Sequence, residues 1–181
     1  MKTLVIHAED SSTDFLCPIY QTIENKTVLR HGNTKNEIAE QIKIHDKVIM
    51  LGHGSPEGLF SVGQFETDNS LIIDSSLISL LAEKEENIYI WCHANKFVER
   101  YNLKGFYTGM FVSEFLELVY CQLPLLGNDV IDESNDGFSS IVSKYVNDSK
   151  SVLYKNTVEE YQIIANRNLI AAYNIDRLYY Q

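Results

Sequence analysis

The chain has 181 residues, of which 45% are hydrophobic and 22% charged, so it is long enough for one domain with a hydrophobic core and short for two. Its formal net charge of −10 at pH 7 argues against nucleic acid or an anionic membrane surface as partner, because both would repel it. The same charge favours a cationic substrate or partner.

The N-terminal sequence and the cysteines indicate where the protein works. The first apolar run, residues 4–6, is far shorter than a secretory signal, and no segment reaches the roughly 18 uninterrupted apolar residues of a membrane span. We therefore expect a cytoplasmic protein. The three cysteines are widely spaced and form no CxxC pair, which predicts free thiols rather than disulfides or a zinc site. They are Cys17, Cys92 and Cys121.

Strands and helices are predicted to alternate along the first 51 residues. The polar cluster Ser11-Ser12-Thr13-Asp14 is typical of a helix start, and the apolar residues after it recur at helical spacing. A second helix is predicted to turn Ile38, Ile42 and Ile44 inward. The third strand is an unbroken apolar run, as expected when helices cover both faces of a parallel sheet. The predicted elements are strands at 2–7, 27–30 and 46–51 and helices at 15–23 and from Asn33-Thr34 to about His45.

The remaining sequence continues the alternation and ends in a helical pattern. Between residues 55 and 74 the helical period disappears, and two extended pieces predict a small hairpin. The predicted elements are these pieces at 58–62 and 70–73, a helix at 75–84, a strand at 87–91, a glycine-containing loop at 105–109, helices at 112–121 and 136–146, an edge strand at 151–154 and a long C-terminal helix at about 157–180. The pattern predicts a single α/β domain over residues 1–181, with a doubly wound, mainly parallel sheet flanked by helices.

Two residues with reactive side chains follow the third and fourth main strands. His53 lies between Gly52 and Gly54, and Cys92 comes directly after Trp91. In open α/β sheets, ligands bind outside the carboxyl ends of the strands. The 39 positions between the two residues (92 − 53 = 39) match one crossover connection, so their strands are predicted to be neighbours. A histidine and a cysteine would then face one cleft.

Such a pair is suited to acyl transfer. A thiolate attacks a carbonyl carbon, a nearby imidazole lowers the thiol pKa or delivers a proton to the leaving amine, and backbone N–H groups stabilise the oxyanion. Gly54 has no Cβ, so a substrate carbonyl could approach its backbone N–H. The N–H of Cys92 is the second candidate donor.

An apolar strand that ends in His-Gly, followed by a second apolar strand that ends in Cys, resembles the caspase-like peptidases: caspases, metacaspases, gingipains, separase and the bacterial CHAT proteases. The matching segments are Val48-Ile49-Met50-Leu51-Gly52-His53-Gly54 and Ile88-Tyr89-Ile90-Trp91-Cys92. The resemblance covers roughly residues 1–125 and implies a caspase-like or flavodoxin-like three-layer sandwich. It implies a cysteine endopeptidase without a cofactor, acting on a peptide or protein, with Cys92 as nucleophile, His53 as general acid and Gly54 as an oxyanion donor. The family usually has a glycine one to three residues after its cysteine, whereas the first glycine after Cys92 is Gly105.

The candidate residues also have structural interpretations. Cys92 would be a small buried residue that ends a core strand, and His53 would cap a helix or hydrogen-bond a loop. His7 and His93 also follow predicted strands, so a metal site is an alternative. However, Cys92 and His93 are adjacent on a strand, point to opposite faces and make poor co-ligands. We predict no metal. The acidic segment 9–14 either lines a pocket for a basic side chain or caps a helix.

A non-catalytic α/β binding or regulatory module is the alternative function. Ser11-Ser12-Thr13 could be the phosphate loop of a flavodoxin-like protein, although the usual glycine is missing. Trp91-Cys92-His93-Ala94-Asn95 is similar to the Trp-Cys-x-x-Glu element of TIR domains, with Asn95 in place of the catalytic glutamate. A phosphoacceptor receiver is excluded, because it would have an aspartate where the third strand ends in Gly52-His53. The sequence therefore predicts a caspase-like cysteine peptidase, active or degenerate, or such a module.

Overall fold

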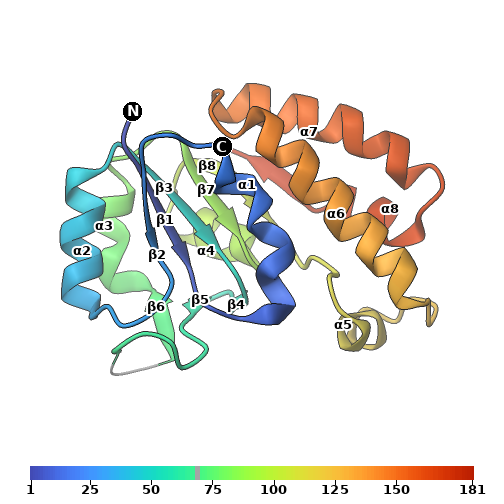
Figure 1. Ribbon diagram of the computed structural model, residues 1–181, viewed down its shortest axis with the longest axis horizontal. Helices are drawn as coiled ribbons and strands as arrows, with labels where there is room; N and C mark the ends of the chain where they lie inside the picture. Colours follow the sequence, from blue (N-terminus) through green and yellow to red (C-terminus); the bar gives the residue numbers. More distant parts are fainter. Residues whose placement is uncertain (68–69) are drawn as a thin grey trace.

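The computed structural model describes residues 1–67 and 70–181 and contains a central six-stranded sheet (Figure 1). The strand order is β2-β1-β3-β7-β8-β9; the first five strands are parallel, and β9 is antiparallel to β8. The strands are β1 (Thr3–His7), β2 (Lys26–Leu29), β3 (Lys47–Leu51), β7 (Asn87–Ile90), β8 (Gly105–Thr108) and β9 (Leu178–Tyr180). The predicted α/β fold, with a mainly parallel sheet between helices, is confirmed.

Helices cover both faces of this sheet and form two separate cores with it (Figure 1). Successive side chains of a strand point to opposite faces. Leu4 and Ile6 of β1 accordingly belong to one core, and Val5 belongs to the other. The helices of the first core are α2 (Lys35–Ile44), α3 (Ile78–Leu81) and α4 (Ala94–Arg100). Those of the second are α1 (Pro18–Gln21), α6 (Asn128–Tyr145), α7 (Lys150–Ala165) and α8 (Leu169–Ile175).

A small antiparallel sheet lies between β3 and α3 in the sequence. Its strands are β4 (Gly54–Ser55), β5 (Gly58–Phe60) and β6 (Leu71–Ile73). The predicted hairpin is therefore confirmed, while residues 68 and 69, which come between β5 and β6 in the sequence, lie outside the described residues. The two short helices η1 (Ser11–Leu16) and η2 (Ser75–Leu77) have the tighter 3-10 geometry and precede α1 and α3.

The middle of the chain contains one helix and one strand that the sequence prediction lacks. Helix α4 begins almost directly after β7 and is only seven residues long, too short for a clear helical period. Strand β8 was predicted as a loop because it begins at Gly105. That glycine has a φ of 144°, and a Cβ there would lie 2.0 Å from the carbonyl oxygen of Asn87. Gly105 thus allows β8 to pair closely with β7.

The C-terminal prediction is wrong in two places. Residues 151–154, predicted as an edge strand, belong to helix α7. The predicted helix at 157–180 is interrupted, because the Asn168 side chain accepts hydrogen bonds from the N–H groups of Ile170 and Ala171 and so begins a new helix, α8 (Leu169–Ile175). The chain then forms β9, which pairs with β8.

Three further points concern the helices. Ile38 and Ile42 are buried as predicted, but Ile44 at the end of α2 is 61% exposed. Helix α6 begins at Asn128, well before the predicted start at residue 136. No helix within 1–67 and 70–181 is both long and apolar enough to cross a membrane.

Candidate functional site

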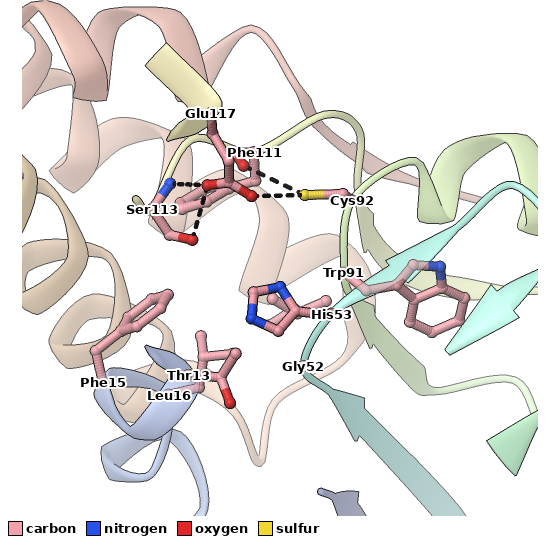
Figure 2. A pocket seen from close by; sticks show the side chains of 11 residues that line it. Thr13, Phe15, Leu16, Gly52, His53, Trp91, Cys92, Phe111, Ser113 and Glu117 are labelled. Carbon is pink, nitrogen blue, oxygen red and sulfur yellow. Dashed lines mark hydrogen bonds between the residues drawn. The ribbon is translucent and has the colours of Figure 1, made fainter. Parts of the chain in front are cut away.

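The two predicted reactive residues lie at the carboxyl edge of the sheet, directly after two paired strands. β3 and β7 are parallel neighbours, with Leu51 paired to Ile90. His53 and Cys92 each come two residues after this pair, and the N–H of Gly52 donates to the carbonyl oxygen of Ile90 (3.1 Å). The predicted adjacency of the two strands is confirmed. Both side chains line the same cavity (Figure 2).

The imidazole of His53 faces polar and acidic side chains. Its Nε2 lies 2.7 Å from Oγ of Ser12, 3.6 Å from Oδ2 of Asp10 and 3.7 Å from Oε1 of Glu114. Ser12 is at hydrogen-bond distance, and the two carboxylates act through their charge. Asp10 is also the N-cap of η1. The acidic segment 9–14 therefore caps a helix and borders the cleft as well.

The thiol of Cys92 is held by a different part of the chain. It donates hydrogen bonds to the carbonyl oxygen of Phe111 (3.4 Å) and to Oε1 of Glu117 (3.3 Å; Figure 2). Burial, and after it the negative charge of Glu117, raises the pKa of the Cys92 thiol well above its ordinary value. The thiol is therefore protonated at neutral pH in this arrangement. Within the described part of the chain, no hydrogen bond joins His53 to Cys92.

Glu117 is fixed by the start of the short helix α5 (Phe115–Tyr120). Its Oε2 accepts hydrogen bonds from the N–H and Oγ of Ser113 (2.6 and 3.0 Å) and from the N–H of Glu114 (3.0 Å). The two glutamates form a reciprocal capping box at the helix N-terminus. Because one carboxylate oxygen is engaged there, the other is directed at the Cys92 thiol.

Gly54 has a packing reason that the sequence prediction does not contain. A Cβ at this position would lie 2.2 Å from Cδ1 of Trp91 and 2.7 Å from the carbonyl oxygen of Gly58. The indole ring fills this space, and its Nε1 donates to the carbonyl oxygen of Ser55 (3.1 Å). Gly54 also lines a cavity together with His53 and Cys92. Its role as an oxyanion donor stays a prediction.

Two cavities are lined by both His53 and Cys92, and a third shares Phe15 and Ser113 with the first of them. The first, of about 20 Å³, lies between His53, Cys92 and Glu117. The second, of about 520 Å³, opens beside the same three residues toward the exposed Tyr120. The third, of about 350 Å³, lies between η1, α5 and α6. Its lining residues are Ser11, Ser12, Phe15, Ser113, Glu114, Phe115, Asn128, Ile131, Asp132 and Asn135.

The other histidines at strand ends have different environments. His7 at the end of β1 is fully buried, with Nδ1 3.1 Å from Oη of Tyr20 and Nε2 3.1 Å from Oγ1 of Thr13. Burial, with the positive charge of Arg30 second, lowers the pKa of His7 to about 4. His93 has a left-handed backbone, with a φ of 67°. In residues 1–67 and 70–181, no three His, Cys, Asp or Glu side chains are grouped so that they could hold a metal ion.

No family model, curated protein or solved structure matches the chain. The function therefore has to be inferred from the geometry of the site and from the sequence resemblance.

The sequence indicated only part of the surroundings of His53 and Cys92: lining a pocket was one of two expectations for the acidic segment 9–14, but none of its residues was assigned to His53, and Glu114 and Glu117 were not considered. Ser12 and Asp10 belong to a segment that was predicted mainly from its helix-capping pattern. Glu114 and Glu117 have the three-residue spacing of a capping box, which could have located the start of α5. No local pattern indicates that this helix start lies against Cys92, because the contact spans 25 residues of sequence.

Proposed function

We propose that the chain is a caspase-like cysteine peptidase, with Cys92 as nucleophile and His53 as the group that transfers protons. The parallel pairing of β3 with β7 carries the proposal, because it brings both side chains to one cavity at the ligand-binding edge of the sheet. All three cysteines are free, which is compatible with thiol chemistry in a reducing cytoplasm.

The proposed reaction is the hydrolysis of a peptide bond through a thioester. The Cys92 proton passes to His53, and the thiolate attacks the carbonyl carbon to form a C–S bond. The C–N bond breaks as His53 gives the proton to the leaving amine. Water then transfers a proton to His53 and its hydroxide adds to the thioester. Breaking of the C–S bond releases the acid, and the Cys92 thiolate takes the proton back from His53. Gly54 and Cys92 would supply backbone N–H groups to the oxyanion.

The contact between Glu117 and Cys92 defines a resting state in this proposal. A carboxylate beside the thiol opposes formation of the thiolate, which is the reactive form. Glu117 therefore has to move away from Sγ before the reaction. Its helix, α5, is only six residues long, so its displacement would disturb a small part of the fold.

We further propose that the substrate carries a basic side chain next to the scissile bond. Glu114 and Asp132 contribute carboxylates to the cavity of about 350 Å³, and no lysine or arginine of the described chain lines it. Asn135 lines the same cavity, and its buried Oδ1 has no hydrogen-bond partner among the described residues. A guanidinium or ammonium group has several N–H donors for these acceptors.

A non-catalytic binding module is the second candidate, and two observations favour it. The Cys92 thiol is held in its unreactive, protonated form. In addition, four of the six α5 side chains are large, hydrophobic and exposed, as at many protein interfaces. They are Phe115, Leu116, Val119 and Tyr120. In this reading His53 and Cys92 have structural roles only.

Peptidyl chloromethyl ketones test the proposal, because a thiolate displaces their chloride and remains attached. Two probes that differ in one side chain, arginine or aspartate next to the ketone, are compared at pH 7.5, with peptide mass spectrometry to locate the adduct. We expect the arginine probe to modify Cys92 at least about tenfold faster than the aspartate probe. In His53→Ala, the rate should fall about 100-fold, as is typical for loss of a general acid or base.

The controls separate the two candidates. His31→Ala removes an exposed imidazole elsewhere and should leave the rate unchanged. Labelling of Cys92 no faster than that of Cys17 or Cys121 would reject the peptidase and favour the binding module. Equal rates with both probes would reject the basic substrate preference while leaving the peptidase proposal intact.

A further inference from the structure

Asp10, Ser12 and His53 form a chain of side-chain hydrogen bonds that the proposed reaction does not itself use. Oγ of Ser12 lies 2.8 Å from Oδ1 of Asp10 and 2.7 Å from Nε2 of His53. The residues reach the same place from adjacent strands, because η1 follows β1 and His53 follows β3, and these two strands are paired. The chain of contacts therefore joins the ends of two neighbouring strands.

The chemistry of the three groups decides which of them donates and which accepts in each of these hydrogen bonds. A hydroxyl has one hydrogen, and a carboxylate can only accept, so the Ser12 hydrogen goes to Asp10. The short contact with Nε2 then requires that His53 donates its own N–H to Oγ of Ser12. The reverse arrangement would turn the oxygen lone pairs of Ser12 toward the Asp10 carboxylate at 2.8 Å, which is repulsive.

The charges around the ring favour the same direction. The Asp10 and Glu114 carboxylates lie 3.6 and 3.7 Å from Nε2, where they stabilise a positive N–H dipole. Burial raises the pKa of Asp10, but hydrogen bonds from the N–H and hydroxyl of Ser12 outweigh it, so the net pKa is lowered. Asp10 is thus an anion at neutral pH, and its carboxylate, at the end of this series of hydrogen bonds, can only accept.

With Nε2 protonated and directed at Ser12, the neutral ring keeps its lone pair on Nδ1. In Figure 2, one ring nitrogen of His53 lies on the side toward Thr13, and the other lies on the side toward Cys92 and Glu117. We infer that Asp10 and Ser12 are positioning residues, which hold His53 as the Nε2–H tautomer so that Nδ1 is free to exchange protons with Cys92. The catalytic part of this inference rests on the proposed function; the tautomer does not.

Nuclear magnetic resonance tests the tautomer directly and without any substrate. Long-range proton–nitrogen correlations of the ¹⁵N-labelled protein, assigned by comparison with His53→Gln, distinguish a protonated from an unprotonated ring nitrogen. In the wild type at pH 8, we expect the Nε2–H pattern for His53. Ser12→Ala should move it toward the averaged pattern of a free imidazole. Ser11→Ala, which changes the exposed neighbouring hydroxyl, should leave it unchanged.

Two results would overturn the inference. One is an Nδ1–H pattern for His53 in the wild type, and the other is a pattern that Ser12→Ala does not change. Because these measurements do not depend on peptidase activity, their outcome stands even if Cys92 proves unreactive.

The pH profile of Cys92 labelling tests the positioning role. Rates are measured with the arginine chloromethyl ketone from pH 5 to 9. The titratable groups that face His53 are Asp10, Glu114, Glu117, Cys92 and His93. The pKa of Asp10 is lowered and that of Cys92 is raised, so neither of these two changes its protonation in this range. Ser12→Ala and Asp10→Asn should lower the maximal rate about tenfold and change the shape of the profile. Ser12→Thr keeps the hydroxyl and should restore both.

The two proposals can fail separately in this experiment. If Cys92 of the wild type is not labelled, the proposed function fails, and the resonance data alone decide the tautomer. If Cys92 is labelled but Ser12→Ala and Asp10→Asn match the wild type, the peptidase stands and the positioning role is rejected. A rate that falls in Ser12→Ala and is not restored by Ser12→Thr would also reject it.

Discussion

The two sides of the cleft differ in the chemistry that surrounds their reactive groups. His53 follows β3, has a side chain that is 27% exposed, and faces Ser12 and two carboxylates. Cys92 follows β7, and its thiol donates hydrogen bonds to Glu117 of α5 and to the carbonyl oxygen of Phe111 in the segment before that helix. The contacts of His53 favour a ring that carries a proton at Nε2. The contacts of Cys92 oppose the thiolate.

The pairing of the strands and the chemical surroundings of the two residues are therefore separate properties of the fold. The pairing of β3 with β7 decides that the two residues meet. The segments that follow β1 and β8 then supply hydrogen-bond partners and charges: Ser12 of η1 contacts His53, and Glu117 of α5 contacts Cys92. Changes in the sheet should therefore affect both residues together, whereas a change at Ser12 should affect His53 and a change at Glu117 should affect Cys92.

The largest expected effect comes from Gly54→Ala, which would disturb both sides at once. The added Cβ would lie 2.2 Å from Cδ1 of Trp91, in a space that the indole ring fills. We expect the free energy of unfolding to fall by about 3 kcal/mol, which urea denaturation would measure. Gly32→Ala is the matched control: it has a φ of 72° but no atom within 4 Å, so it should cost only about 1 kcal/mol. Equal losses in both variants would contradict the packing role of Gly54.

His7 lies at the end of a third strand, β1, and is fully buried, unlike the partly exposed His53 in the cleft. The native protein keeps His7 neutral down to a pKa of about 4, whereas the unfolded chain binds a proton below about 6.5. Stability from this group is present above pH 6.5 and is lost as the pH falls toward 4, at about 1.4 kcal/mol per pH unit and about 3 kcal/mol in all.

Urea denaturation at several pH values would measure this loss. In His7→Gln, which cannot take up a proton, the decline between pH 6.5 and 4 should become shallower. The exposed His31→Gln should retain the wild-type decline. A decline in His7→Gln as steep as in the wild type would show that other groups cause the acid sensitivity.

Glu117→Gln should lower the raised pKa of the Cys92 thiol and so reduce the difference between the two sides of the cleft. The glutamine keeps an acceptor for Ser113 but removes the negative charge beside the thiol. Burial, the larger cause of the raised pKa of Cys92, remains, so the change should be partial. We expect about tenfold faster alkylation of Cys92 by iodoacetamide at pH 8, equivalent to about 1.4 kcal/mol. Glu114→Gln, near His53 instead, should not accelerate it, and an unchanged rate in Glu117→Gln would reject the proposed resting state.

The sequence predicted the part of the fold that consists of buried runs with regular spacing. β1, β3 and β7 are continuous apolar segments, and their order along the chain was enough to predict that His53 and Cys92 would come together. The failures lie where tertiary contacts outweigh local pattern. Gly105 was interpreted as a loop residue, although its missing Cβ is what lets β8 approach β7.

The C-terminal region shows the same limit. Aromatic and apolar residues beyond position 157 have helical spacing across Asn168, but its side chain caps a new helix and ends the pattern. Strand β9 then forms by pairing with β8 at the edge of the central sheet. Tyr179 of β9 stacks on Tyr107 of β8, with ring centroids 5.6 Å apart. The protonated state of the Cys92 thiol could not be predicted from the sequence either, because Glu117 comes from a helix far along the sequence.

The smallest expected effect concerns His93, the residue directly after Cys92. Its φ of 67° costs an L-residue roughly 1 kcal/mol, whereas glycine loses about 0.5 kcal/mol more backbone entropy on folding. His93→Gly should therefore raise the free energy of unfolding by about 0.5 kcal/mol, while His93→Ala should keep the strain. Urea denaturation of the three proteins measures the difference. If glycine and alanine are equally stable, the left-handed conformation costs no more than the backbone entropy that glycine loses on folding. If glycine is the more stable but Cys92 is alkylated no faster, a glycine at position 93 relieves the backbone turn after Cys92 without improving access to its thiol.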